Sequence, residues 1–185
     1  NVDAGAKVFL NAQNGDAAGQ FTDTGQSLTS TKTAQSYRAV ATGDIDGDGD
    51  IDTVTGSWGE KMDIWVNDGT GTFSNTGVDG TGRLSVLGVD NTTWGATNGV
   101  ALGDVDGDGD LDVVAFNRYV ANKVFLNDGT GTFTEGTPFG NLVGSGDGTL
   151  ADIDGDGDLD AIDAGYGGVV VSTNDGTGTF TPQSH

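Results

Sequence analysis

The stretch Asp44-Ile45-Asp46-Gly47-Asp48-Gly49-Asp50-Ile51-Asp52 decides the fold of this chain, and it returns at residues 104–112 and 152–160. Carboxylates at loop positions 1, 3, 5 and 9 are hard oxygen ligands, which suit a cation such as Ca²⁺. Glycine at position 6 permits a sharp turn, and the carbonyl of position 7 can complete the ligand shell. Without a cation, carboxylates at this density would repel one another. The sequence therefore predicts three Ca²⁺ sites, formed by Asp44, Asp46, Asp48, Asp50 and Asp52, by Asp104, Asp106, Asp108, Asp110 and Asp112, and by Asp152, Asp154, Asp156, Asp158 and Asp160.

The residues around each loop favour strands over helices. An EF-hand would need a bidentate Glu at position 12 and a helix on each side. Position 12 is instead Thr55, Ala115 or Asp163, and the flanks are short and β-branched, so the loop joins two strands. Apolar residues at positions 2 and 8 alternate with the ligands. We expect them to anchor the loops in a core: Ile45 and Ile51, Val105 and Leu111, and Ile153 and Leu159.

A second motif follows each loop. Val66-Asn67-Asp68-Gly69-Thr70-Gly71-Thr72-Phe73 recurs at 126–133 and 173–180, and a degenerate copy runs from Leu10 to Phe21. Asn-Asp-Gly and Thr-Gly tolerate positive φ, so each copy predicts a β-hairpin. A strand, the acidic loop, two more strands, the turn and a short strand then make a four-stranded antiparallel propeller blade.

The loop spacing predicts the domain organisation. The loops start at residues 44, 104 and 152, which is the spacing of blade-sized repeats with one insertion. We expect one all-β domain over residues 1–185, a β-propeller-type array of about three and three-quarter blades. Its parts are a partial blade at 1–35, a blade at 36–78, an insertion at 79–96, and blades at 97–139 and 146–183. Three completions are open: a piece of a longer chain, a compact four-bladed ring, or an assembly in which neighbouring subunits supply the absent strand. Because an unfinished blade has unpaired strand edges, we favour completion by further protein, covalent or from a neighbouring chain.

The composition argues against several classes of partner. The formal net charge is −21, and three divalent ions would leave −15, which disfavours nucleic acid and anionic membranes. There is no cysteine for disulfides, and no apolar run approaches the ~18 residues of a membrane span. The chain starts at Asn1 without an initiator Met or a signal peptide. We expect a processed, secreted bacterial protein that is extracellular or lies at the cell surface.

On these loops and turns the chain resembles the FG-GAP/VCBS repeat proteins, whose units resemble those of the integrin α-chain propeller. The resemblance implies that each loop binds Ca²⁺ between the first two strands of a blade. It assigns side-chain ligands to loop positions 1, 3, 5 and 9 and a carbonyl ligand to position 7, for example Asp110. Such propellers usually have seven blades, and this chain has just over half of that number.

The sequence offers little for catalysis. His185 is the only histidine, cysteine is absent, and the seven Lys and Arg residues are scattered. The carboxylates are committed to metal, which keeps them ionised and leaves no general acid. We therefore expect no enzyme.

Two functional hypotheses remain, with an accessory domain of a polysaccharide-active enzyme as a weaker third. The first is an adhesion or recognition module for a glycan or protein at the cell surface. Trp65 lies in an expected strand and should be core, whereas four other aromatics lie in connecting segments and could either stack on sugar rings or pack between blades. These four are Trp58, Trp94, Tyr119 and Tyr166. The second hypothesis is a structural subunit of a Ca²⁺-stabilised extracellular fibre or surface layer, built from copies of the chain.

Overall fold

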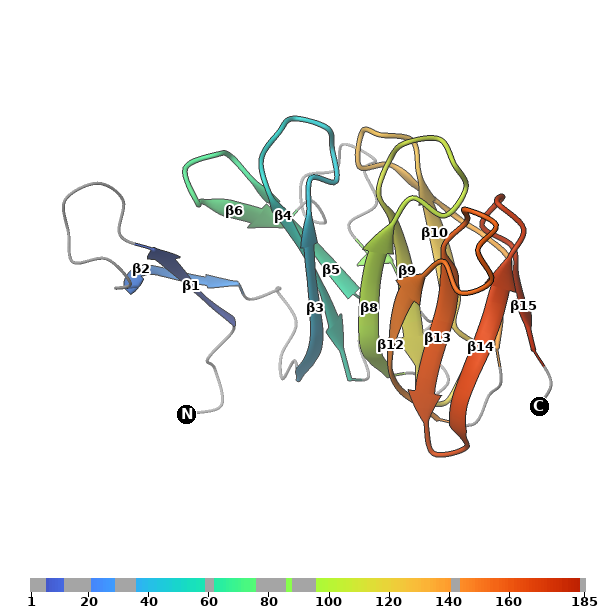
Figure 1. Cartoon of the computed structure of the whole chain (residues 1–185). Coiled ribbons are helices and arrows are strands. Elements are labelled where there is room, and N and C mark those ends of the chain that lie inside the picture. The colour runs from blue at the N-terminus through green and yellow to red at the C-terminus, as the bar shows by residue number, and fades with distance from the viewer. Residues whose placement is uncertain are drawn as a thin grey trace.

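The structure is a computed structural model that describes residues 6–11, 21–28, 36–58, 62–75, 86–87, 96–140 and 144–183. Every regular element in these ranges is a β-strand, and the strands form separate antiparallel sheets that stand side by side (Figure 1). No helix in the described part of the chain has the length and apolarity to cross a membrane. The predicted all-β array of propeller-type blades is confirmed.

Three sheets repeat one pattern, in which each strand pairs with the next along the chain. The first blade contains β3 (Tyr37–Gly43), β4 (Asp52–Ser57), β5 (Met62–Asn67) and β6 (Phe73–Asn75). The second blade contains β8 (Thr97–Gly103), β9 (Asp112–Asn117), β10 (Lys123–Asn127) and β11 (Phe133–Glu135). The third blade contains β12 (Ser145–Ala151), β13 (Asp160–Gly165), β14 (Gly168–Asn174) and β15 (Phe180–Pro182).

The strand registers are the same in the three blades. Each acidic loop connects the first two strands, because the residue before the loop pairs with the Asp at position 9: Gly43 with Asp52, Gly103 with Asp112, and Ala151 with Asp160. Each Asn-Asp-Gly turn connects the last two strands, with Asn67 opposite Phe73, Asn127 opposite Phe133, and Asn174 opposite Phe180. The first strand of every blade also has a register shift after its first residue. The three blades therefore share the same backbone arrangement.

The remaining strands lie outside this template. β1 (Ala6–Asn11) and β2 (Phe21–Leu28) form a two-stranded sheet in which Asn11 pairs with Phe21, as the degenerate hairpin motif predicts. β7 (Val86–Leu87) lies within the predicted insertion and pairs with β5 at Met62 and Asp63. The first blade therefore has five strands where the sequence predicts four.

The main cores lie between neighbouring blades. One apolar cluster joins the first and second blades and includes Val54, Ile64 and Phe125; another joins the second and third blades and includes Phe116 and Phe180. Glycine is needed where the blades approach most closely. A methyl group on Gly148 of β12 would overlap the Phe116 ring of β9. Burial thus depends on contacts between blades rather than within one sheet.

The prediction that the apolar loop residues anchor each loop in a core is right at some positions and wrong at others. Ile45 and Val105 are 1% exposed, but Ile153 is 49% and Ile51 is 54% exposed. At position 2 the cover comes from the next blade, whose turn reaches the loop: the Gly178 amide donates to the Val105 carbonyl over 2.9 Å. Position 8 instead packs on the preceding blade. A methyl group on Gly43 would lie 2.5 Å from Leu111 Cδ1, and one on Gly103 would lie 2.7 Å from Leu159 Cδ1. Within the described residues, Ile153 has no following blade and Ile51 has no complete preceding one.

Candidate functional site

Each acidic loop gathers three carboxylates around one point. In each cluster, one oxygen from every member lies within 4.8 Å of the others. Oxygens bound to the same Ca²⁺ at about 2.3–2.6 Å can be separated by no more than about 5 Å. The arrangement therefore fits one hard cation per loop. The clusters are Asp44, Asp46 and Asp48; Asp104, Asp106 and Asp108; and Asp152, Asp154 and Asp160.

Backbone amides curl each loop around its first carboxylate. In the first loop the Gly47 amide donates to Asp44 Oδ1 over 2.9 Å, and the Gly49 amide donates to Asp44 Oδ2 over 3.0 Å. These glycines have φ values of 74° and 93°, a region that residues with a Cβ rarely occupy. The second loop repeats both hydrogen bonds at Asp104. The glycines of the motif are thus required by the backbone of the loop.

The aspartate at position 9 connects the loop to the rest of its blade. Asp52, Asp112 and Asp160 are completely buried. In the second blade, Asp112 Oδ2 accepts from the Val105 amide and Oδ1 accepts from the Asn127 amide, both over 2.8 Å. The first and third blades repeat this pair of bonds at 2.9 Å. The sequence predicted these residues only as ligands, and the structure adds that they join the loop to the Asn-Asp-Gly hairpin.

The aspartate at position 7 directs its side chain to the hairpin of its own blade. A methyl group on Gly129 would lie 2.5 Å from Asp110 Oδ2, and one on Gly176 would lie 2.6 Å from Asp158 Oδ2. Asp50 lies against Gly69 in the same way. None of the three belongs to a carboxylate cluster of the described residues. This placement leaves the carbonyl of position 7 as its candidate ligand atom.

Ionisation is costly in these loops. Burial raises the pKa of Asp112 to about 6, and burial also raises the pKa of Asp52 above its ordinary 3.8. The pKa of Asp106 is raised by burial and then by the neighbouring charges of Asp108 and Asp104. In contrast, the Thr70 hydroxyl lowers the pKa of the exposed Asp68 in the hairpin turn. A divalent cation would offset the cost in the loops, because it favours the ionised carboxylates.

An asparagine from each following hairpin holds the preceding loop. Asn127 Nδ2 donates to the Ile45 carbonyl over 2.8 Å and to the Leu111 carbonyl over 3.1 Å. Asn174 Nδ2 repeats the pattern one blade later, at 2.7 Å to Val105 and 3.2 Å to Leu159. Loops and hairpins thus share one edge of the array, which we call the loop edge. These bonds couple the position of each loop to that of the next blade.

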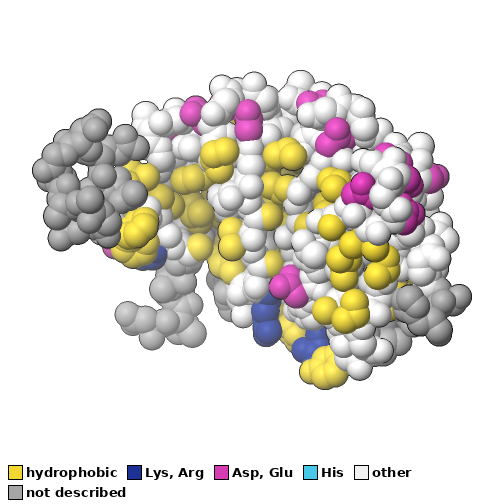
Figure 2. All heavy atoms as spheres, in the orientation of Figure 1, with side chains coloured by type: hydrophobic (Ala, Val, Ile, Leu, Met, Phe, Trp, Pro, Cys, Tyr) yellow, Lys and Arg dark blue, Asp and Glu magenta, His cyan; other side chains and the backbone are white. Residues whose placement is uncertain are grey.

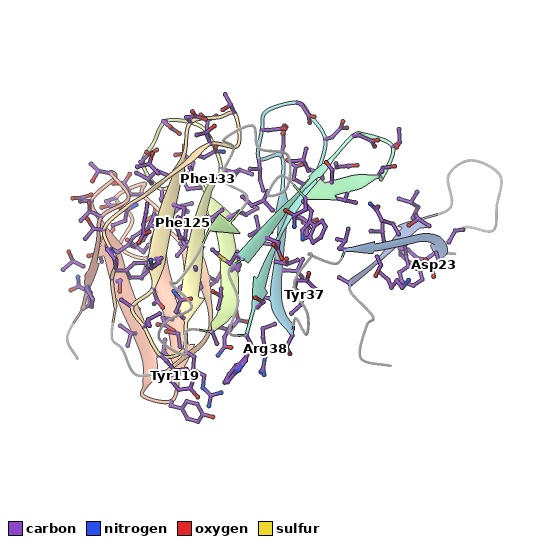
Figure 3. All side chains as sticks on the ribbon, turned by 180° about the vertical axis from the view of Figure 1, so that it is seen from behind. Asp23, Tyr37, Arg38, Tyr119, Phe125 and Phe133 are labelled. Carbon is purple, nitrogen blue, oxygen red and sulfur yellow. The ribbon has the colours of Figure 1, made fainter. Side chains whose placement is uncertain are left out.

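The opposite edge carries the turns between the second and third strands of the blades, and we call it the turn edge. Figure 3 shows Arg38 and Tyr119 together there, far from the acidic loops. The Trp58 and Tyr119 rings meet edge to face with centroids 5.9 Å apart. Arg118 Cζ lies 5.4 Å from the centroid of Trp58, 5.0 Å from that of Tyr119 and 5.1 Å from that of Tyr166. We call Arg38, Trp58, Arg118, Tyr119 and Tyr166 the aromatic patch.

The patch brings together three of the four predicted stacking residues. Trp94 lies outside the described residues. Tyr119 and Tyr166 are 46% and 81% exposed, so neither ring is buried between blades. Trp65 is 4% exposed and its Nε1 donates to Thr55 Oγ1 over 3.2 Å, which confirms it as core.

Both arginines of the patch were missed by the sequence reasoning. One signal was available, because Arg118 directly precedes Tyr119 in a chain with only seven Lys and Arg residues. An arginine next to a candidate stacking residue is therefore informative in this protein. Arg38 had no such signal, because its place over Trp58 depends on the fold.

A cavity of about 690 Å³ separates the β1–β2 sheet from the first blade. Its lining is mostly apolar and includes Val8, Leu10, Leu28, Val40 and Ile51. No ionisable cluster identified in the described residues lies in it. The cavity lies where the array lacks a complete preceding blade. It therefore results from the incomplete packing at this end of the array, and we do not assign it a ligand.

Comparison with known proteins agrees with this architecture. No curated protein matches the chain. One solved structure that it resembles belongs to an Agrocybe aegerita lectin, studied for its specific recognition of non-reducing terminal N-acetylglucosamine. The identity is 26% and the TM-score 0.59, over 96% of this chain and 46% of the lectin, so the chain spans under half of the lectin's length. The family model for the FG-GAP-like repeat matches residues 44–115 and 104–162. The chain therefore belongs to the FG-GAP-like repeat family.

Proposed function

We propose that this chain is a Ca²⁺-stabilised propeller module that recognises glycans outside the cell and acts by binding rather than by catalysis. The observation that carries the proposal is the aromatic patch, where the exposed Tyr119 and Tyr166 and the half-buried Trp58 bring rings from three successive blades together at the turn edge. Exposed aromatic rings offer flat apolar faces with polar rims, which suit sugar rings. The resemblance to a glycan-binding lectin supports the same class of ligand.

Calcium has a structural role in this proposal. Each loop presents only oxygen donors at spacings that fit a Ca²⁺ shell, with position 7 contributing its carbonyl. At a tenfold excess of free Ca²⁺ over the dissociation constant, three independent sites would together add about 4 kcal/mol to the free energy of unfolding. Melting in 1 mM Ca²⁺ and in EGTA measures this contribution. An unchanged melting temperature in EGTA would rule out the structural role.

Glycan binding can be tested with the Ca²⁺-loaded chain on an array of neutral and acidic glycans, followed by calorimetry on the best ligand. Tyr166→Ala should weaken binding about two- to twelvefold, because a stacked ring contributes about 0.5–1.5 kcal/mol. Phe21→Ala is the matched control, since Phe21 is also an exposed aromatic, at 67%, but lies on β2 away from the patch. Equal loss in both variants, or no ligand on the array, would refute the proposal.

A structural subunit is the second candidate, favoured by the open faces at both ends of the array. Ile153 and Ile51 are about half exposed, whereas Ile45 is buried by the next blade. Exposed apolar faces of this kind suit association with further blades or with neighbouring chains. Native mass spectrometry with and without Ca²⁺ separates the candidates. Ca²⁺-dependent polymers would support the structural subunit, and a stable monomer that binds a glycan would exclude it.

A further inference from the structure

Three residues of the aromatic patch occupy the same position in successive blades. The residue that follows the second strand donates its amide to the carbonyl that precedes the first strand. The bonds are Trp58 to Ser36 at 3.0 Å, Arg118 to Ala96 at 2.9 Å and Tyr166 to Gly144 at 3.2 Å. The blade repeat thus builds a row of Trp, Arg and Tyr along the turn edge. Arg118 is its middle member, which explains how one guanidinium reaches the rings of both neighbouring blades.

The guanidinium of Arg118 is held by rings and not by a carboxylate. It lies within 5.4 Å of three ring centroids, and its Nη2 donates to Tyr166 Oη over 3.1 Å. Its Nε is buried and has no hydrogen-bond partner among the residues that the structure describes. An arginine carries five N–H donors, and an orphaned buried donor is costly. The neighbouring rings therefore orient the Arg118 side chain, but they do not provide a hydrogen-bond acceptor for its buried Nε–H.

A second guanidinium lies on the same tryptophan. Arg38 occupies the register shift in β3 between Tyr37 and Ala39, and such bulges redirect a side chain. Its Cζ lies 4.7 Å from the Trp58 centroid, against 5.4 Å for Arg118. Two like charges share one ring, and the aromatic faces offset only part of their repulsion. An anion bound between the two guanidinium groups would offset the remaining repulsion.

The patch is a cationic spot on a strongly acidic protein. Figure 2 shows most acidic side chains along the loop edge, and Lys and Arg side chains at the opposite edge with one acidic side chain above them. No carboxylate of the described residues lies within ion-pairing distance of Arg38 or Arg118. Lys123 differs, because it pairs with Glu135 over 2.6 Å. The overall charge of −21 would repel a long polyanion, but screening over about 8 Å at physiological salt leaves the local site attractive to a single anionic group.

We infer that the aromatic patch binds a sugar that carries one acidic group, a carboxylate or a sulfate. Tyr119 and Tyr166 would contact the face of the pyranose, and the Arg38 and Arg118 guanidiniums would bind the oxyanion. Guanidinium groups match the planar geometry of a carboxylate and donate charge-assisted hydrogen bonds to oxyanions. The inference deepens the proposed glycan recognition and rests on it.

The test compares three ligands that differ only at C6: methyl β-D-glucoside, methyl β-D-glucuronide and methyl 6-O-sulfo-β-D-glucoside. Binding to the Ca²⁺-loaded chain is followed by NMR chemical-shift titration. An anionic ligand should bind about tenfold or more tightly than the glucoside, because hydrogen bonds to charged groups are stronger than neutral ones. The preference should shrink as NaCl is raised. The tighter of the two anions identifies carboxylate or sulfate as the natural group.

Variants separate the charge from the rings. Arg118→Gln and the exposed Arg38→Gln should each lower the ratio of the affinity for an anionic ligand to the affinity for the glucoside, and Lys123→Gln should leave this ratio unchanged. If Arg118→Gln fails to fold, Arg38→Gln alone decides. Equal affinity for all three ligands would overturn the inference and leave the proposed function standing. No binding of any glycan on the array would overturn both, and an anionic preference retained in both arginine variants would refute the assignment of the site.

Discussion

Removing Ca²⁺ should reverse the effect of pH on the stability of this protein. Asp112 is completely buried, and burial raises its pKa from 3.8 to about 6 in the folded chain. The folded state without metal therefore binds the Asp112 proton more tightly than the unfolded state does. Linkage then requires the free energy of unfolding to rise as the pH falls from 7 towards 4. With Ca²⁺ bound the sign is opposite, because protons compete with the metal for the carboxylates.

The magnitude follows from the pKa of Asp112. At neutral pH its ionisation costs about 3 kcal/mol of folding free energy, and about 1.4 kcal/mol of this returns between pH 7 and pH 5. The raised pKa values of Asp52 and Asp106 act in the same direction. Asp68 acts in the opposite direction, because the Thr70 hydroxyl lowers its pKa, but its contribution is lost only below pH 3.8. The interval from pH 7 to pH 5 therefore isolates the buried carboxylates.

Urea unfolding, followed by tryptophan fluorescence to which the buried Trp65 contributes, measures the effect at pH 7 and pH 5 in metal-stripped buffer and in 1 mM Ca²⁺. The metal-free chain should gain stability at pH 5, and the Ca²⁺-loaded chain should lose it. Asp112→Asn should reduce the metal-free gain by about 1.4 kcal/mol, whatever its effect on overall stability. Asp68→Asn, at an exposed position, should leave the gain unchanged. Metal-free stability that falls between pH 7 and pH 5, or a gain unaffected by Asp112→Asn, would refute the reasoning.

Two further predictions concern contacts between blades, and chemical denaturation in Ca²⁺ measures both. Asn127→Ala removes donors to the Ile45 and Leu111 carbonyls and should cost about 2–3 kcal/mol. Asn67→Ala should cost less, because among the described residues its side-chain amide donates only to Ile51 of its own blade. Equal costs would contradict the coupling of loops to following hairpins. Gly148→Ala places a methyl group against the Phe116 ring and should cost about 1–3 kcal/mol. Gly167→Ala is the control, because its methyl group would meet no atom within 4 Å and the substitution should be nearly neutral. A neutral Gly148→Ala would show that the second and third blades are not closely packed.

The blade itself was predictable because its signals are local. The loop glycines with positive φ and the Asn-Phe pairs across the hairpins are properties of eight or nine consecutive residues, and they recur at blade spacing. Repetition of this motif then predicts an array of blades, because each unit needs neighbouring units to bury its apolar faces. The carboxylate clusters follow for the same reason, since their members lie within one loop.

The features that sequence could not predict depend on neighbours in space. Ile45 and Ile153 are the same residue type at the same loop position, yet one is 1% and the other 49% exposed, because only the first is covered by a following hairpin. Arg38 meets Trp58 only because a bulge turns it towards the next turn. Asp112 looked like a ligand alone, since its bond to the Asn127 amide is invisible without the sheet register. Burial and charge environment are properties of the assembled array.

Two edges with different chemistry follow from the connectivity of a four-stranded antiparallel blade. The first and third connections in each blade lie at the loop edge, where Asp clusters and Asn-Asp-Gly turns are bound to one another. The second connection lies at the turn edge, where consecutive blades place the half-buried Trp58 and Arg118 and the exposed Tyr166 in one row. The Asn127 and Asn174 bonds fix the spacing between blades, and that spacing also sets the distances between the rings and Arg118. A cation in the loops would therefore act on the aromatic patch through blade spacing, without contact with the ligand. Under the proposed function, this arrangement would let the turns vary for recognition while the loops keep a repeated sequence.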